Sequence, residues 1–130
     1  MTDRRIVITG IGVISPLGND LASTWEAMKA GRSGIDTIKS MDVSDYSTKI
    51  AGEVKDFDPT PYFKTPKDAR RVDRFTHFAM GAAGMALKDS GMDLEAVDKT
   101  RIGVMVGSGI GGLGTLESQH ATLISRGPAR

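Results

Sequence analysis

The sequence predicts an α/β fold built from layers of helices and strands, and three observations carry this prediction. Short runs of β-branched and other apolar residues at positions 5–9, 48–54 and 102–106 have the composition of strands. Between and after them lie segments in which apolar residues recur every three or four positions, as in amphipathic helices. The resulting order, strand, helix, irregular strand, helix, strand, helix, is typical of layered α/β architectures.

The first strand-like run stops at Gly10 and Gly12, which indicates a tight turn at the end of a buried strand. A helix follows, with Asn19 or Asp20 as its N-cap and Gly31 as its C-terminal stop. Its apolar face comprises Leu21, Trp25 and Met28. After the irregular strand at residues 48–54, three prolines indicate a loop, at Pro59, Pro61 and Pro66.

The clearest helix is predicted from about Ala69 to Ser90, with Gly91 as its stop. Its apolar positions are Val72, Phe75, Ala79, Ala82 and Ala86. Gly81 and Gly84 each cost helix propensity about 1 kcal/mol relative to alanine. We therefore expect this helix to pack closely against a neighbour at its centre. A further helix is predicted over residues 116–125.

Composition bounds the class of protein. With 130 residues, 39% hydrophobic and 25% charged, the chain suits one globular domain whose core needs no disulfide or metal. Seventeen basic and sixteen acidic residues argue against a general nucleic-acid binder. The absence of cysteine excludes disulfides, thiolate metal sites and a cysteine nucleophile from these residues. The start lacks a signal-peptide pattern and the longest uncharged run is too short for a bilayer, so we expect a cytoplasmic protein.

A glycine-rich segment, Gly107-Ser-Gly-Ile-Gly-Gly112, matches the dinucleotide-binding fingerprint between a predicted strand and a predicted helix. Its position weakens that interpretation, because the first strand of such a fold normally opens the domain. The acidic partner expected about 20 residues later would also fall past Arg130. The alternative is that the glycines allow close packing or make room for a ligand that is not a nucleotide.

Basic residues cluster where the clearest helix begins, and Asp68 and Asp73 interrupt them. The cluster comprises Lys64, Lys67, Arg70, Arg71 and Arg74. Four of these are spaced so that one helix could present them on one face. The cluster is either a solvated face or a docking surface for an acidic partner. His77 and His120 are isolated, so we expect structural roles for both, with no metal site and no cofactor.

Three motifs in order identify a family resemblance that covers essentially the whole chain. They are Val7-Ile-Thr-Gly-Ile-Gly-Val-Ile-Ser-Pro-Leu-Gly18, Asp73-Arg-Phe75 and Gly107-Ser-Gly-Ile-Gly-Gly-Leu-Gly114. Together they resemble the N-terminal part of the β-ketoacyl-[acyl-carrier-protein] synthases, most closely the synthase II type. The resemblance implies the thiolase-like fold, with two related α/β halves in five α-β-α-β-α layers and a homodimer. Residues 1–130 match only part of the first half, the β-ketoacyl synthase N-terminal domain truncated before the catalytic cysteine.

The resemblance also implies a reaction, the decarboxylating Claisen condensation of fatty-acid elongation. A cysteine takes an acyl chain from acyl carrier protein, and the enolate formed when malonyl-carrier protein loses CO₂ attacks that thioester. The family's cysteine and two histidines follow the region present here, and neither His77 nor His120 matches them. Hence no catalytic residue is assigned, and we expect residues 1–130 alone to be inactive.

Two binding roles carry over from the resemblance to residues of this sequence. Lys67, Arg70 and Arg71 match the positions that dock the acidic helix of acyl carrier protein. Ile110 matches a position beside the acyl-chain tunnel, where side-chain bulk influences the chain lengths accepted.

Alternatives to a condensing enzyme stay open at this point. They are a non-catalytic relative such as a chain-length factor, a polyketide ketosynthase, and a module that only binds the carrier protein. Because the family completes its sheets with strands from the second half, we expect residues 1–130 alone to leave sheet edges and apolar helix faces open. Such a piece should be unstable or strongly associated.

Overall fold

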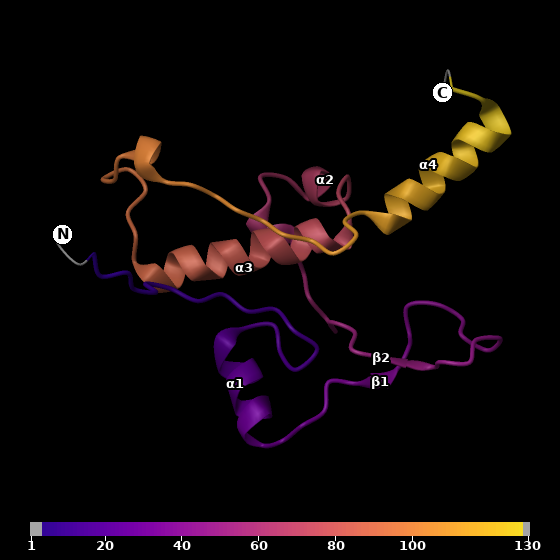
Figure 1. Cartoon of the computed structure of the whole chain (residues 1–130), viewed down its shortest axis with the longest axis horizontal. Helices are drawn as coiled ribbons and strands as arrows, with labels where there is room; N and C mark the ends of the chain where they lie inside the picture. Colours follow the sequence, from indigo (N-terminus) through magenta and orange to yellow (C-terminus); the bar gives the residue numbers. More distant parts are fainter. Residues whose placement is uncertain (1–3, 129–130) are drawn as a thin grey trace.

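The longest helix, α3 (Arg74–Ser90), forms an axis along which other segments lie (Figure 1). The computed structural model describes residues 4–128, and over this range it combines helices, extended segments and one small sheet. The other elements are α1 (Leu21–Lys29), β1 (Asp36–Thr37), β2 (Ile50–Ala51), η1 (Thr60–Tyr62), α2 (Pro66–Ala69), η2 (Lys99–Arg101) and α4 (Leu113–Arg126). Strands β1 and β2 pair antiparallel. No helix in the described range has the length and apolar character that crossing a bilayer requires.

The close packing predicted at the centre of the long helix is confirmed. A Cβ at Gly81 would lie 2.6 Å from the Phe57 ring and 2.7 Å from Ile14 Cδ1. A Cβ at Gly84 would lie 2.8 Å from the Tyr62 ring. Both glycines are thus required by aromatic or aliphatic side chains that lie directly on the helix.

The N-terminal segment runs along α3 at backbone contact distance. A Cβ at Gly10 would collide with the carbonyl oxygen of Ala86, and one at Gly12 with the carbonyl group of Ala82. The prediction of a tight turn at Gly10 and Gly12 is therefore wrong, since this stretch continues past successive turns of α3. The tight turn lies at residues 15–18, where the two end residues exchange backbone hydrogen bonds.

Helix α1 starts and stops where the sequence predicts. The carboxylate of Asp20 accepts a hydrogen bond of 2.7 Å from the Ser23 amide, which caps the helix and lowers the pKa of Asp20. Gly31 adopts a positive φ of 64° just after the helix ends. The apolar face is exposed rather than buried, with Trp25 and Met28 more than half accessible.

The predicted strands differ most from the structure. Residues 5–9 and 102–106 form no ladder within the described part of the chain, and the run at 48–54 pairs only at β2. Ile6, Val104 and Met105 are 89%, 87% and 97% exposed, although their composition predicts burial. A strand needs a partner edge and a covered face, and residues 4–128 provide neither to these two segments.

The helix predicted from about Ala69 is in fact two helices. Thr65 caps the short helix α2 and Pro66 occupies its first position, so helical structure begins before the predicted start. Residues 70–73 then interrupt it, and α3 begins only at Arg74 after Asp73 in an extended conformation. The region that the prolines marked as a loop therefore contains two short helical turns, η1 and α2. Helix α4 begins three residues before its predicted start.

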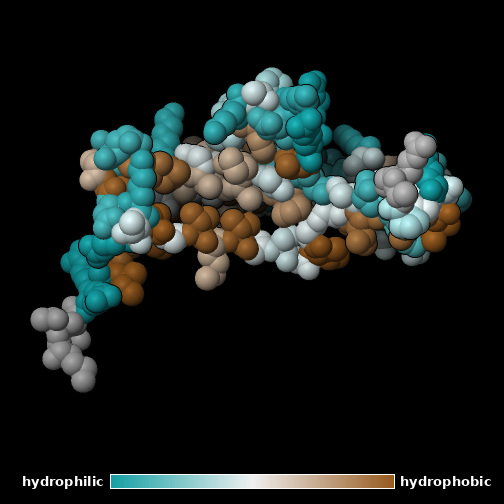
Figure 2. Space-filling model, turned by 90° about the horizontal axis from the view of Figure 1, so that it is seen from above, coloured by the Kyte–Doolittle hydropathy of each residue, from teal (hydrophilic) through white to brown (hydrophobic). Residues whose placement is uncertain are grey.

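The buried core of the described residues is small. Its hydrophobic members are Ala27, Phe57 and Ala69. Phe57 is the largest of these, and its ring lies 6.0 Å from those of Tyr62 and Phe78. Many apolar side chains face solvent instead, as the space-filling view shows (Figure 2). The expectation that apolar helix faces stay open is confirmed on α1 and α4.

Candidate functional site

Three basic residues of the predicted cluster, Lys67, Arg70 and Arg71, lie on α2 and the turn after it. We refer to these three residues as the basic turn. All three are exposed, and within residues 4–128 none of them forms an ion pair. These three cations lie within five residues and have no ion-pair partner in the described structure, so they leave a local positive potential.

The two acids near these cations, Asp68 and Asp73, accept hydrogen bonds from threonine hydroxyls. The Asp68 carboxylate accepts a 2.9 Å hydrogen bond from the Thr65 hydroxyl, which belongs to the N-terminal cap of α2. The Asp73 carboxylate accepts a 2.6 Å hydrogen bond from the Thr115 hydroxyl on α4. Neither acid is paired with the basic turn, although alternation of sign in the sequence suggests local neutralisation.

His77 of α3 holds the basic turn in place. Ala69 is 4% exposed, and its carbonyl oxygen accepts a 2.7 Å hydrogen bond from Nε2 of His77. The His77 ring also meets the Phe63 ring edge to face, at 5.8 Å between centroids. His77 therefore has the structural role that its isolation in the sequence predicts.

Arg74 does not share a face with the basic turn, so the prediction of one common helical face is wrong. The break at residues 70–73 separates α2 from α3. The Arg74 guanidinium lies 4.8 Å from the centre of the Phe78 ring and donates to the Phe57 carbonyl oxygen at 3.4 Å. It therefore ties the loop before η1 to α3 through a cation–π contact and a hydrogen bond.

Ile110 lies at the exposed centre of the glycine-rich segment, with 78% of its surface accessible. A Cβ added at Gly103, Gly107 or Gly109 would have no neighbour within 4 Å among the described residues. Within residues 4–128 these glycines therefore make no close contacts, in contrast to those of α3.

The start of α4 is unsuited to a pyrophosphate. Gly112 is the N-cap of α4, and a Cβ there would collide with the Asp73 carboxylate. A carboxylate thus occupies the helix end where the dinucleotide fingerprint would place phosphate, and two anions at that position would repel. The geometry favours the alternative interpretation of the glycines.

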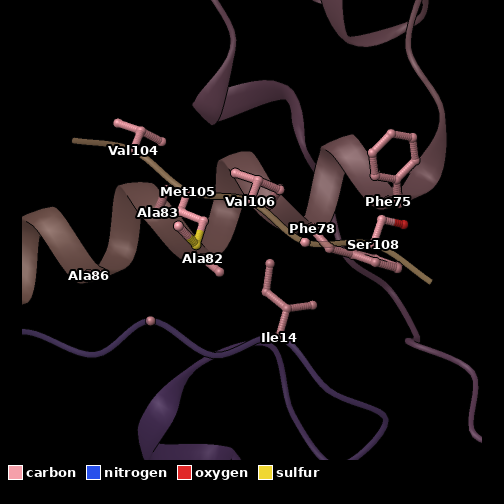
Figure 3. A pocket seen from close by; sticks show the side chains of 13 residues that line it. Ile14, Phe75, Phe78, Ala82, Ala83, Ala86, Val104, Met105, Val106 and Ser108 are labelled. Carbon is pink, nitrogen blue, oxygen red and sulfur yellow. The ribbon is translucent and has the colours of Figure 1, made fainter. Parts of the chain in front are cut away.

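An apolar groove of about 620 Å³ lies between α3, Ile14 and residues 104–108, and sequence reasoning missed it (Figure 3). Phe75 and Phe78 line one end, and alanines of α3 line its floor. The exposed apolar run at residues 102–106 is the sequence signal that could have found it. Ile110 is not among the lining residues.

The remaining histidine, His120, is exposed on α4 beside Leu116 and Leu123. Among residues 4–128 no group of three or more His, Asp or Glu side chains is placed to hold a metal ion.

Comparison with known proteins gives concordant matches. The sequence profile described as "Beta-ketoacyl synthase, N-terminal domain" matches residues 3–128. The chain is 45% identical over 130 residues to the 3-oxoacyl-[acyl-carrier-protein] synthase 2 of Vibrio harveyi, and 46% identical over 128 residues to the protein of that name from Staphylococcus aureus (strain COL). The alignments include 100% and 98% of this chain and 31% of each relative's length.

Two solved structures share the fold of the described residues. One is titled "The ishigamide ketosynthase/chain length factor", with a TM-score of 0.71 and 28% identity. The other, a type II PKS acyl-carrier protein in complex with its ketosynthase, gives a TM-score of 0.70 and 27% identity. Each match includes 93% of this chain and 30% of the matched chain.

Proposed function

This chain belongs to the β-ketoacyl synthase family, and we propose that it is the N-terminal part of a 3-oxoacyl-[acyl-carrier-protein] synthase of fatty-acid elongation. In the proposed reaction a cysteine thiolate accepts the acyl group, with the carrier thiol as leaving group. Loss of CO₂ from malonyl-carrier protein yields an enolate, whose carbon attacks the acyl thioester and displaces the cysteine thiolate. Residues 1–130 contain no cysteine, so other residues of the protein must supply the nucleophile.

The role proposed for the residues present is to dock the carrier protein through the basic turn. The observation that carries this role is that Lys67, Arg70 and Arg71 are exposed and form no ion pair within residues 4–128. The neighbouring acids Asp68 and Asp73 bond to threonine hydroxyls instead. An acidic helix that approaches such a surface gains long-range attraction, which salt weakens. The matched structure in which a ketosynthase holds its acyl-carrier protein supports the choice of partner.

We propose that Ile110 borders the acyl chain in the complete enzyme. The neighbouring glycines support this, because they place no side chains beside Ile110, where an apolar chain needs room. Each methylene buried there would contribute about 0.8 kcal/mol to discrimination between chain lengths.

The thiolase-like layers and the homodimer are also proposals for the complete enzyme. The extended runs at residues 5–9 and 102–106 would become strands once partner edges are present. Their exposure, and that of Leu116 and Ile124 on α4, supports this proposal, because further protein would cover these apolar surfaces.

A second candidate is a non-catalytic chain-length factor, because a ketosynthase/chain length factor is among the matched structures. The two candidates share the fold and differ in the presence of the cysteine. Transfer of radiolabelled acyl groups from acyl-carrier protein to the full-length protein would support the synthase, and binding without transfer would support the chain-length factor.

Docking is tested with single charge reversals in the full-length protein. Arg70→Glu and Arg71→Glu should each raise the Kd for acyl carrier protein by about tenfold at low salt, with a smaller effect at high salt. Lys88→Glu is the matched control, since Lys88 is exposed on α3 about 20 Å along the helix from Arg74. Equal effects of all three variants would contradict a localised docking surface, as would a Kd that none of them changes.

A further inference from the structure

Asp73 stands at the start of α3, yet its carboxylate does not cap that helix. The residue has N-cap backbone geometry, with φ −74° and ψ 163°, but its side chain makes no capping hydrogen bond. An aspartate at this position ordinarily accepts from an amide of its own first turn, as Asp20 does in α1. The Asp73 carboxylate accepts instead from the Thr115 hydroxyl, 42 positions along the chain.

The far end of this hydrogen bond is the first turn of α4. Gly112, the N-cap of α4, has no side chain with which to cap it. The Asp73 carboxylate fills the space that a Cβ at Gly112 would need, and it would lie 3.8 Å from a Cβ at Gly114. One negative charge therefore lies at the start of two helices, where both helix dipoles favour it.

The glycine-rich segment has few other attachments. Within residues 4–128, the bond between Asp73 and Thr115 is the one hydrogen bond that joins residues 103–128 to the rest of the chain. All residues from 101 to 110 are exposed. On α4, Leu116 and Leu123 border a shallow apolar hollow with Phe75 and are themselves about half exposed or more.

We propose that Asp73 is a positioning residue, which fixes the segment carrying Ile110 to the helix that supports the basic turn. This rests on the proposed function, in which the basic turn docks the carrier and Ile110 borders the acyl chain. Asp73 touches neither ligand. It acts through Thr115, by holding residues 107–112 at one distance from the docking surface. Loss of the bond should disturb the acceptance of long acyl chains and leave docking intact.

The first test is hydrogen–deuterium exchange in the full-length protein. Asp73→Ala and Thr115→Val should each accelerate exchange at residues 107–112 by about tenfold, and the double variant should add nothing further. Thr115→Ser keeps the hydroxyl and should restore protection. The matched control is Thr122→Val, which lies on the same helix and loses only a local bond to the Ser118 carbonyl.

The second test measures carrier binding and acyl transfer with a series of acyl chain lengths. In Asp73→Ala and Thr115→Val the transfer rate for long chains should fall about tenfold relative to short chains. The Kd for acyl carrier protein should not rise. Asp68→Asn removes a nearby negative charge without touching Thr115, so it controls for electrostatic effects on docking.

The outcomes separate this proposal from the proposed function. Unchanged exchange at residues 107–112 in both variants overturns the positioning role, whatever the transfer rates. Faster exchange with an unaltered chain-length profile overturns the link to the acyl chain. A wild-type protein that transfers no acyl group overturns the proposed synthase, while the exchange experiment still decides whether Asp73 positions the segment.

Discussion

The glycines of this chain fall into two groups with opposite surroundings. Gly12, Gly81 and Gly84 lie in contacts so close that a methyl group would collide with backbone or with an aromatic ring. Gly103, Gly107 and Gly109 have no atom of the described residues within 4 Å of an added Cβ. The first group brings segments together. The second lies in a stretch that, within residues 4–128, one hydrogen bond joins to the rest of the chain. Glycine content alone therefore does not separate packing from open space.

The largest effect is expected from a substitution at a closely packed glycine. Gly12→Ala should lower the free energy of unfolding by about 3 kcal/mol, because its methyl group would meet the rigid backbone of Ala82. Gly109→Ala is the matched control and should stay within about 0.5 kcal/mol of wild type, since no atom of residues 4–128 lies within 4 Å of an added Cβ and Gly109 lies outside the run proposed to become a strand. Thermal and urea unfolding of the full-length protein measure both changes. Similar losses in the two variants would contradict the distinction between the groups.

The sequence predicted the helices better than the strands, for a physical reason. Asp20 and Gly31 delimit α1 through contacts within a few residues, and Gly91 ends α3 with a φ of 63°. Strands depend on distant partners, so the composition of residues 5–9 and 102–106 could not reveal whether a ladder forms. The break between α2 and α3 was missed because the apolar spacing from Val72 onward continues through the place where Asp73 is extended.

The sequence predicts which charged residues form the candidate site, but it does not predict how they are arranged on the surface. The positions of Lys67, Arg70 and Arg71 follow from the resemblance, and the structure adds that all three are exposed. The i, i+4 spacing of Arg74 and Phe78 places these two side chains together on one helix. Nothing in the sequence indicates that Arg74 also meets Phe57, which lies 17 positions earlier. The hydrogen bond between Asp73 and Thr115 also could not be predicted, because the two residues are 42 positions apart.

A moderate effect is expected from a substitution of His77, which joins α3 to the basic turn. His77→Ala removes the donor to the Ala69 carbonyl and the contact with Phe63. Since the Ala69 carbonyl would lose its partner, we expect a loss of about 1.5 kcal/mol and faster amide exchange at residues 64–71. His77→Gln retains an N–H donor and should recover part of the protection. Unchanged exchange at residues 64–71 in His77→Ala would show that the turn holds its shape without this bond.

The smallest effect is expected at the start of α1. Asp20 caps its own helix, whereas the Asp73 carboxylate accepts a hydrogen bond from the first turn of a distant helix, α4. Asp20→Ala should lower the free energy of unfolding by about 1 kcal/mol at neutral pH, with faster exchange confined to α1. The Ser23 amide and hydroxyl lower the pKa of Asp20 in the folded state from its ordinary value of 3.8.

The sign of the pH dependence follows from that lowered pKa. The charged form of Asp20 is favoured by folding, so its extra contribution is complete above the unfolded pKa and is lost as pH falls through the folded one. Hence the gap between wild type and Asp20→Ala in urea unfolding should begin to narrow as pH falls below about 4 and should close below the folded pKa. Asp20→Asn, which caps without charge, should lie between them at pH 7 and vary less with pH. If the gap between wild type and Asp20→Ala stayed constant down to pH 2.5, the carboxylate charge would have no part in the cap, and the contrast with Asp73 would rest on hydrogen-bond geometry alone.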